Sequence, residues 1–239
     1  MIQYRNLISV YNGLKGRENP EWSNFWYDDA DDNSKKRYLI VGDSTARMVR
    51  STFAKLSHSP CDLLGTSCAL DDELFVNQLE AFFNNTIYKY DIIYVQLGHH
   101  SRINKNGEPY QENDYIKFEH DFTALCNYLN QFCRKVVVES VFMSVMPKIH
   151  KRKVRGTRML RKLGLLKTEK EIPDEFANSI KRRKNKIIEN VAIKNKYFFC
   201  NLCSFMEEKK IPHIDHIHYV ESAKPIIVYK MMEFIDYAY

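Results

Sequence analysis

Residues 38–47 have the sequence YLIVGDSTAR, an apolar run of four followed directly by glycine, aspartate and serine. A short apolar run closed by a glycine is typical of a strand that is buried on both faces of a parallel sheet. The residues that follow, 45–56, have the spacing of a helix. This stretch therefore predicts a strand that turns sharply into a helix, with Ser44 at the turn.

The same order of strand and helix recurs along the rest of the chain. Further strands are expected at 91–97, 135–142 and 197–202, and further helices at 74–83, 115–133, 178–196 and 224–237. Strands that alternate with helices build mainly parallel sheets with helices on both faces. The sequence thus predicts an α/β fold, a three-layer α/β/α sandwich around a mainly parallel sheet.

The length and composition are those of a globular protein. The chain has 239 residues, of which 44% are hydrophobic and 28% charged, and these proportions exclude wholesale disorder and low-complexity polymers. Typical domains have about 150 residues, so one domain with an insertion fits this length better than two. We expect a single domain over residues 1–239, with an irregular lead-in at 1–36 and a basic insertion at about 148–177.

No membrane-spanning or secretory segment is expected. The longest apolar run has four residues, whereas a membrane helix needs about 20. The first residues, MIQYRNLISVYNG, contain no apolar stretch of the kind found in signal peptides. We therefore expect a cytoplasmic protein, with peripheral contact at the inner face of a membrane as a variant of that expectation.

The six cysteines do not predict a metal site. Cys200 and Cys203 form a CxxC pair, but no second CxxC or paired histidines of zinc-binding spacing accompany it. Both lie in the apolar stretch YFFCNLCSF, which favours ordinary buried thiols.

The positive charge is concentrated in one region. Residues 148–196 contain 17 Lys and Arg against five Asp and Glu, a net charge of +12, while the rest of the chain has 19 against 25, a net of −6. Such a concentration favours a local anionic partner. Residues 148–172 are open to three interpretations: a lid that binds an anionic glycan or the phosphates of an acyl-CoA, an amphipathic surface on anionic lipid, or a solvated loop without a ligand. Nucleic acid ranks last, because these residues include no Phe, Tyr or Trp for base stacking.

Two short motifs, one in each half of the chain, contain candidate catalytic residues. Ser44 follows a buried strand at the start of a helix, where backbone N–H groups and the positive helix end stabilise an oxyanion. Asp215 and His218 lie three apart just before the last helix, a spacing that lets the carboxylate orient the imidazole toward a serine hydroxyl. The alternatives are a helix-capping serine and a histidine-rich loop, either without function or holding a metal.

Four blocks in chain order together resemble the SGNH, or GDSL-like, hydrolase superfamily. They are GDS at 42–44, a glycine-centred turn at 64–68, LGHH at 97–100 and DHIH at 215–218. The sequence GDSTAR at 42–47 is similar to the branch that contains polysaccharide O-acetylesterases and O-acetyltransferases. The resemblance runs from about residue 38 to the end of the chain, and it implies a flavodoxin-like three-layer sandwich that transfers an acyl group from an ester to water or to a sugar hydroxyl.

The resemblance implies a role for each matching residue. Ser44 would be the nucleophile, His218 the general base and then acid, and Asp215 the residue that orients His218. No metal is implied.

It also implies an oxyanion hole and substrate contacts. The oxyanion donors would be the backbone N–H of Ser44, a backbone N–H at Gly65 or Cys68, and the side chain of His100, where the family has asparagine. A neutral imidazole can donate one N–H, so His100 can take that role. The residues expected to contact substrate are Arg47, His99 and Ser101. Arg47 would bind a substrate carboxylate or hold the turn near Asp43, and a solvated helix arginine is the alternative.

The expected function is that of a serine-dependent O-acyl esterase or O-acetyltransferase acting on an acetylated carbohydrate or surface polysaccharide. It needs no cofactor, and acetyl-CoA would be the acyl donor of a transferase. The sequence does not separate hydrolysis from transfer. The alternative from another class is a catalytically weak or inactive module of the same fold that binds an anionic polymer or a membrane through its basic insertion.

Overall fold

The computed structural model describes residues 3–11, 23–29, 35–99, 110–145 and 174–236. The six strands are β1 Ser23–Trp26, β2 Tyr38–Gly42, β3 Cys61–Thr66, β4 Tyr90–Gln96, β5 Cys133–Glu139 and β6 Phe198–Cys200. The α-helices are α1 Ser44–Ser57, α2 Glu73–Asn85, α3 Glu112–Leu129, α5 Asp174–Asn195, α6 Leu202–Glu208 and α7 Lys224–Asp236. Two short 3-10 helices are η1 Tyr4–Asn6 and η2 Glu221–Ala223.

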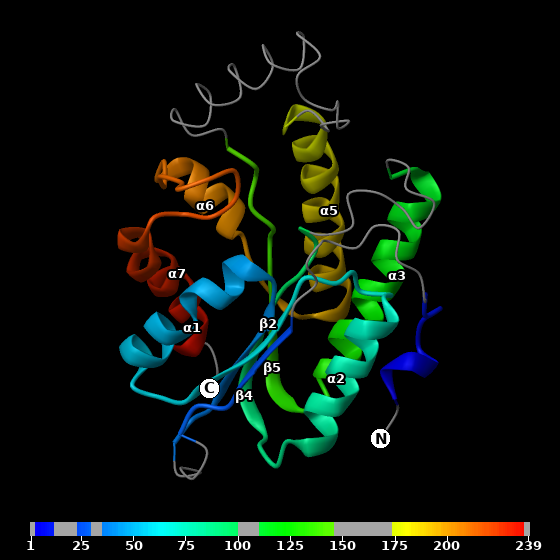
Figure 1. Cartoon of the computed structure of the whole chain (residues 1–239), viewed down its shortest axis with the longest axis horizontal. Coiled ribbons are helices and arrows are strands. Elements are labelled where there is room, and N and C mark those ends of the chain that lie inside the picture. The colour runs from blue at the N-terminus through cyan, green and yellow to red at the C-terminus, as the bar shows by residue number, and fades with distance from the viewer. Residues whose placement is uncertain (1–2, 12–22, 30–34, 100–109, 146–173, 237–239) are drawn as a thin grey trace, which may run out of the picture.

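One six-stranded sheet runs through the molecule in the order β1-β3-β2-β4-β5-β6. All neighbours are parallel except β1, which pairs antiparallel with β3. Helices α1, α6 and α7 cover one face of the sheet, and α2, α3 and α5 cover the other (Figure 1). The prediction of an α/β sandwich with a mainly parallel sheet is confirmed.

Side chains from alternate positions of each strand divide the core in two. In β2, Leu39 and Val41 face α2 and α3, whereas Tyr38 and Ile40 face α1 and α7. This period of two is expected because successive side chains of a strand point to opposite faces. Both faces of the central strands are therefore buried, which explains why β2 and β4 are nearly continuous apolar runs.

The structure differs from the sequence-based expectation at both ends of the sheet. The lead-in expected to be irregular contains η1 and β1, and β3 was not among the expected strands. The strand expected at 197–202 ends at Cys200, and α6 begins two residues later. The first residues of α5 fall within the expected insertion 148–177, most of which lies outside the described residues.

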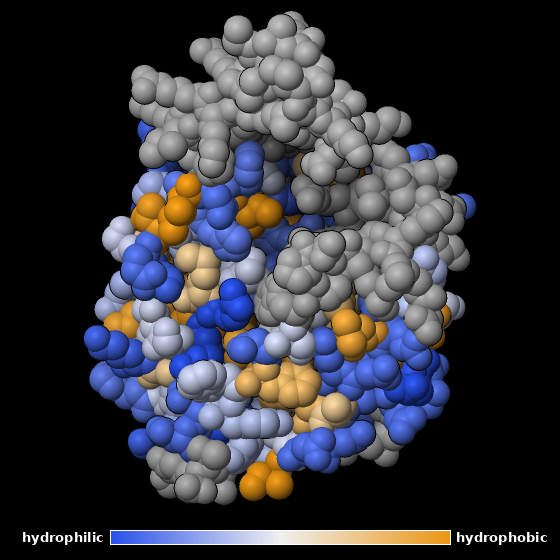
Figure 2. All heavy atoms as spheres, viewed as in Figure 1, coloured by the Kyte–Doolittle hydropathy of each residue, from blue (hydrophilic) through white to orange (hydrophobic). Residues whose placement is uncertain are grey.

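The surface shown in Figure 2 is mainly hydrophilic, with small hydrophobic patches separated by charged side chains. Within the described residues, every helix is too short or too polar to cross a bilayer. The compact sandwich places the carboxyl ends of five parallel strands along one edge of the sheet, where ligands bind in open α/β folds.

Candidate active site

The turn from β2 into α1 presents Ser44 at that edge. A Cβ at Gly42 would lie 2.4 Å from the Cβ of Ala46 and 2.8 Å from the carbonyl oxygen of Gln96, so the close approach of helix and strand requires glycine. Asp43 then caps the helix, because its Oδ1 accepts a hydrogen bond of 2.9 Å from the Thr45 N–H. Ser44 is the first residue of α1 and is partly exposed.

The loop before η2 carries the second half of the site. The Oδ1 of Asp215 accepts hydrogen bonds of 2.8 Å from the backbone N–H groups of both Ile217 and His218. Its Oδ2 lies 2.7 Å from the Nδ1 of His218. The aspartate thus holds both the loop and the imidazole ring, as the three-residue spacing predicts.

Electrostatics fix the tautomer of His218. Partial burial raises the pKa of Asp215, but the hydrogen bonds from Ile217 and His218 outweigh it and lower that pKa to about 2. Asp215 is therefore ionised at neutral pH, and its Oδ2 accepts a hydrogen bond from the Nδ1–H of His218. With the ring proton on Nδ1, Nε2 is the atom that can accept from the Ser44 hydroxyl.

The two halves meet across 174 positions of sequence. The Nε2 of His218 lies 2.8 Å from the Oγ of Ser44, within reach of a proton transfer. The Tyr219 hydroxyl also donates a hydrogen bond of 2.7 Å to the carbonyl of Thr45 and so fastens the loop to the start of α1. Ser44, His218 and Asp215 thus form one continuous chain of hydrogen bonds.

Of the expected oxyanion donors, the Ser44 N–H lies in a suitable place, whereas Gly65 lies within a strand and the Cys68 N–H already has an acceptor. Ser44 lies at the N-terminus of α1, where backbone N–H groups lack intrahelical partners. Gly65 lies inside β3, in register with Gly42 of β2, and not in the following loop. The Cys68 N–H donates a hydrogen bond of 3.1 Å to the Thr66 Oγ1, which it would have to leave in order to bind an oxyanion. His100 lies outside the described residues.

Of the residues expected to contact substrate, Arg47 is exposed and His99 is buried. Arg47 is exposed on α1, one turn after Ser44. His99 is only 4% exposed, and its Nε2 accepts a hydrogen bond of 3.1 Å from the Phe142 N–H. Its ring therefore lies beneath the surface. Ser101 lies outside the described residues.

Gly98 shapes the backbone before His99. Its φ is +133°, and a Cβ there would lie 3.2 Å from the Val141 Cγ1, so glycine suits both the conformation and the space. The Gly98 carbonyl accepts a hydrogen bond of 3.2 Å from the ammonium of Lys184, a fully buried residue of α5.

Two site-forming features escaped the sequence analysis. One is Tyr219, the residue directly after His218, and the other is the segment 140–145, whose Val145 N–H donates a hydrogen bond of 2.8 Å to the His216 carbonyl. A tyrosine beside a histidine carries no distinctive signal. The segment 140–145 matters only through partners far away in sequence.

A buried acid lies under the site. Glu139 ends β5 and is 1% exposed, and burial together with the negative charge of Asp43 raises its pKa to about 8. Within the described part of the chain, its Oε1 has no hydrogen-bond partner. Glu139 therefore carries its proton at neutral pH.

The cysteines and the acidic groups make no metal centre in the described residues, where no three His, Cys, Asp or Glu side chains are placed to hold an ion. Burial raises the pKa of Cys203 to about 11 and that of Cys200 well above its usual range. Thiols of such high pKa are poor nucleophiles at neutral pH.

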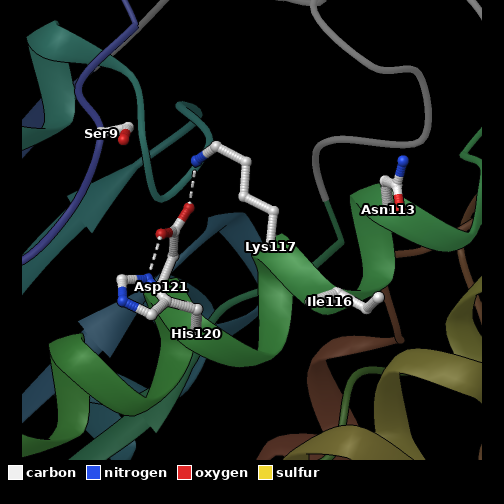
Figure 3. A pocket seen from close by; sticks show the side chains of 6 residues that line it. All are labelled: Ser9, Asn113, Ile116, Lys117, His120 and Asp121. Atoms are coloured by element: carbon white, nitrogen blue, oxygen red, sulfur yellow. Dashed lines mark hydrogen bonds and ion pairs between the residues drawn. The ribbon is translucent and has the colours of Figure 1, made fainter.

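A hollow of about 390 Å³ lies along the outer face of α3 (Figure 3). Helix α3 covers the face of the sheet opposite to α1 (Figure 1). In Figure 3 the carboxylate of Asp121 reaches both Lys117 and His120. Lys117 also pairs with Asp71 at 2.9 Å. The hollow is separate from Ser44 and His218.

No protein-family model matches this sequence, and no curated protein matches it either. Solved structures do match. An SGNH hydrolase from Slackia heliotrinireducens has a TM-score of 0.55 at 12% identity, over 84% of this chain and 100% of its own. A GDSL-like lipase from Bacteroides thetaiotaomicron has a TM-score of 0.54 at 17% identity, over 85% and 89%.

A third similar structure is the acetylxylan esterase Axe2 from Geobacillus stearothermophilus, with a TM-score of 0.53 at 11% identity, over 84% of this chain and 94% of its own. Identities this low establish a shared architecture and no more. Together with the sheet order and the flanking helices, the three structures show that this chain has the SGNH-hydrolase fold.

Proposed function

We propose that this protein is a serine-dependent O-acyl esterase or O-acetyltransferase that acts on an acetylated carbohydrate. The observation that carries the proposal is the hydrogen-bonded chain from the Ser44 Oγ through the His218 ring to the Asp215 carboxylate, with distances of 2.8 and 2.7 Å. These three side chains match in identity and order the groups that activate a serine for acyl transfer.

In the first half of the reaction, the Ser44 Oγ attacks the ester carbonyl carbon while its proton passes to the His218 Nε2. The carbon–oxygen bond to the sugar then breaks, and the same proton passes from Nε2 to the leaving sugar oxygen. The acyl group remains on Ser44 as an ester. Asp215 stays ionised throughout and stabilises the imidazolium that forms.

In the second half, water or another hydroxyl gives its proton to the His218 Nε2 and attacks the acyl carbon. The bond to the Ser44 Oγ breaks, and that oxygen recovers the proton. Esterase and transferase differ only in which acceptor enters at this step, so one arrangement of side chains serves both.

The negative oxygen of each tetrahedral intermediate needs donors near Ser44. The Ser44 N–H lies at the N-terminus of α1, where the helix dipole also favours negative charge. We assign this N–H to the oxyanion hole, with His100 as a side-chain donor. We also assign Arg47, which is exposed one turn along α1, to substrate contact.

The carbohydrate substrate is supported by the similarity to Axe2, whose name describes an acetylxylan esterase. The excess of Lys and Arg at 148–196 favours an acetylated sugar that also carries negative charge, or an acyl-CoA donor in a transferase.

Mass spectrometry of the protein mixed with p-nitrophenyl acetate tests the chemistry. We expect release of p-nitrophenol by the wild type and an acetyl adduct on Ser44, and both should form much more slowly in His218→Ala, which lacks the base of the first step. Ser44→Ala should abolish both, whereas the matched control Ser51→Ala, an exposed serine further along α1, should abolish neither. If the wild type neither releases p-nitrophenol nor becomes acetylated, the proposal fails and an inactive binding module remains.

The same preparation tests the acceptor and the substrate class. Release of acetate from acetylated xylooligosaccharides, but not from aliphatic acetates of similar size, would support a carbohydrate esterase. Acetylation of Ser44 by acetyl-CoA, with transfer to an added sugar, would instead support the transferase. Equal rates on sugar and aliphatic esters would contradict the assignment of a carbohydrate substrate.

A further inference from the structure

The segment 140–145 continues from β5 beyond the end of the neighbouring strand. The Ser140 N–H still donates to the Cys200 carbonyl at 3.1 Å, but Cys200 is the last residue of β6. From Val141 onward, the backbone is largely buried and has no strand beside it on that edge. Each N–H therefore needs a partner from elsewhere.

Side chains and loops from four different parts of the fold supply those partners. The acceptors are the Asn185 Oδ1 for Val141 at 2.8 Å, the His99 Nε2 for Phe142 at 3.1 Å, the Cys203 thiol for Met143, the Asn178 Oδ1 for Ser144 at 2.7 Å and the His216 carbonyl for Val145 at 2.8 Å. The burial of His99 is consistent with this role, because its Nε2 accepts a backbone hydrogen bond from this segment.

Two asparagines of α5 act as a substitute for the missing strand. The amide of Asn185 also donates a hydrogen bond of 2.9 Å to the Val141 carbonyl, and that of Asn178 donates one of 2.9 Å to the Ser144 carbonyl. Each asparagine thus binds both the N–H and the C=O of one residue. The two lie seven positions apart, on one face of the helix.

Lys181 reinforces the clamp at Ser144. It lies between the two asparagines on α5, is 1% exposed, and donates a hydrogen bond of 2.8 Å from its ammonium to the Ser144 Oγ. Ser144 is therefore held through its N–H, its carbonyl and its hydroxyl, all by α5. The next residue, Val145, donates its N–H to the His216 carbonyl in the loop of the candidate site.

The link from Val145 to the loop falls next to Asp215. His216, whose carbonyl accepts the Val145 N–H, lies between Asp215 and His218. The loop also bonds to α1 through Tyr219 and His218, and the Tyr219 ring contacts Phe142 of the same segment. The Asp215–His218 pair thus lies between attachments to α1 and attachments to the segment that α5 holds.

We propose that Asn178 is a positioning residue, which holds Asp215 and His218 in register with Ser44 through Ser144, Val145 and His216. The proposal rests on the function proposed above. Asn178 contacts no reacting group, so its effect must appear in the order of the His218 ring and in the rate of chemistry, and not in substrate affinity.

The experiment compares Asn178→Ala with the matched control Asn185→Ala. Each change removes two side-chain hydrogen bonds from α5 to the segment 140–145, those of Asn178 to Ser144 and those of Asn185 to Val141, so both should lower the midpoint of chemical unfolding. Only Asn178→Ala should lower kcat for p-nitrophenyl acetate, by on the order of 100-fold at an unchanged KM, because a small displacement of a catalytic group costs about that factor.

Proton NMR supplies a readout that does not depend on activity. The Nδ1 proton of His218, bonded to the Asp215 carboxylate, should give a strongly deshielded resonance in the wild type and in Asn185→Ala. We expect that resonance to broaden or vanish in Asn178→Ala. A resonance that persists there, or equal kcat losses in the two variants, would overturn the proposal.

A second variant covers the case in which Asn178→Ala fails to fold. Val145→Pro leaves the side chains of α5 unchanged and removes the N–H that bonds to the His216 carbonyl, while its ring also fixes φ at position 145 and restricts Ser144. It should reproduce the loss of the resonance and of kcat, and retention of both would contradict the link. Absence of any Ser44 acylation in the wild type would refute the proposed function, while the NMR comparison would still decide the positioning role.

Discussion

The Tyr219 hydroxyl donates a hydrogen bond of 2.7 Å to the carbonyl oxygen of Thr45. Each of these residues directly follows a member of the candidate triad, Tyr219 after His218 and Thr45 after Ser44. The bond therefore joins the two halves of the site independently of the bond between the imidazole and the serine. Tyr219 is fully buried, so water does not compete for this interaction.

Tyr219→Phe should reduce kcat by about 10-fold and stability by roughly 1 kcal/mol, since a buried hydrogen bond contributes about that much. Ester hydrolysis and chemical unfolding measure the two effects. The matched control is Tyr94→Phe, because the buried Tyr94 hydroxyl donates a bond of 3.1 Å to the Met231 carbonyl of α7. It should lose similar stability and keep its kcat. Equal activity losses in the two variants would argue against a role of Tyr219 in joining the site.

Asp215→Asn should lower kcat by on the order of 10³- to 10⁴-fold without a matching change in KM. The amide retains an oxygen for the loop N–H groups but can present its NH₂ to His218, which favours the tautomer with its proton on Nε2 and leaves no acceptor for the Ser44 hydroxyl. Steady-state kinetics on p-nitrophenyl acetate measure the effect.

The control for Asp215→Asn is Glu221→Gln, which neutralises an exposed carboxylate six residues further along. Glu221 pairs with Lys224 at 2.7 Å and does not contact the triad. It should leave kcat within about twofold of the wild type, as surface ion pairs contribute little. A similar loss in both variants would mean that net charge near the site, and not the tautomer of His218, controls the rate.

Glu139→Gln should change the pH dependence of stability. Burial raises the pKa of Glu139 to about 8, so the folded protein binds this proton more tightly than the unfolded chain. The stability of the wild type therefore falls as the pH rises from about 4.5 to about 8, and glutamine, which never ionises, removes that fall. One pKa unit corresponds to about 1.4 kcal/mol. When the pH rises from 5 to 8, the free energy of unfolding of Glu139→Gln should therefore increase by more than about 1.4 kcal/mol relative to that of the wild type.

Chemical unfolding of wild type and variant at both pH values measures this difference. Glu119→Gln is the control, because Glu119 is a partly exposed residue of α3 paired with Lys194, and it should leave the difference between pH 5 and pH 8 unchanged. Parallel stability curves for Glu139→Gln and wild type would show that Glu139 is already ionised at neutral pH.

The central part of the fold was predictable because its signals are local. The apolar run of β2, the glycine at 42 and the serine after it lie within seven residues, and Asp215 and His218 lie within four. The bond between the Ser44 Oγ and the His218 Nε2 joins two such local motifs. The alternation of strands and helices predicts a mainly parallel sheet, in which ligand sites lie beyond the carboxyl ends of the strands. The order of the strands came only from the structure.

β3 was missed because its sequence, CDLLGT, contains a charge and a glycine. The buried Asp62 carboxylate accepts hydrogen bonds of 2.9 and 2.8 Å from Arg37 and another of 2.8 Å from the Tyr90 hydroxyl, among its partners. These partners come from β4 and from the residue before β2. A strand stabilised by such distant groups has no periodic signal of its own.

His99 shows the same limit at the site. The motif beside Gly98 predicts a contact with substrate, whereas the structure turns the ring inward to accept the Phe142 N–H, 43 positions away. The sequence of residues 97–100 does not show whether His99 is exposed or buried with its ring accepting a backbone hydrogen bond. The positioning role proposed for Asn178 was invisible for the same reason.

The two outermost strands of the sheet are also its shortest: β6 has three residues and β1 has four. Long, flat edges with unpaired backbone groups recruit strands from other molecules and so seed aggregation. Because β1 and β6 are short, each edge strand has only a few backbone groups that could pair with another molecule. The longer central strands, beside which Ser44 lies, have a neighbouring strand on each side and so are shielded from intermolecular pairing.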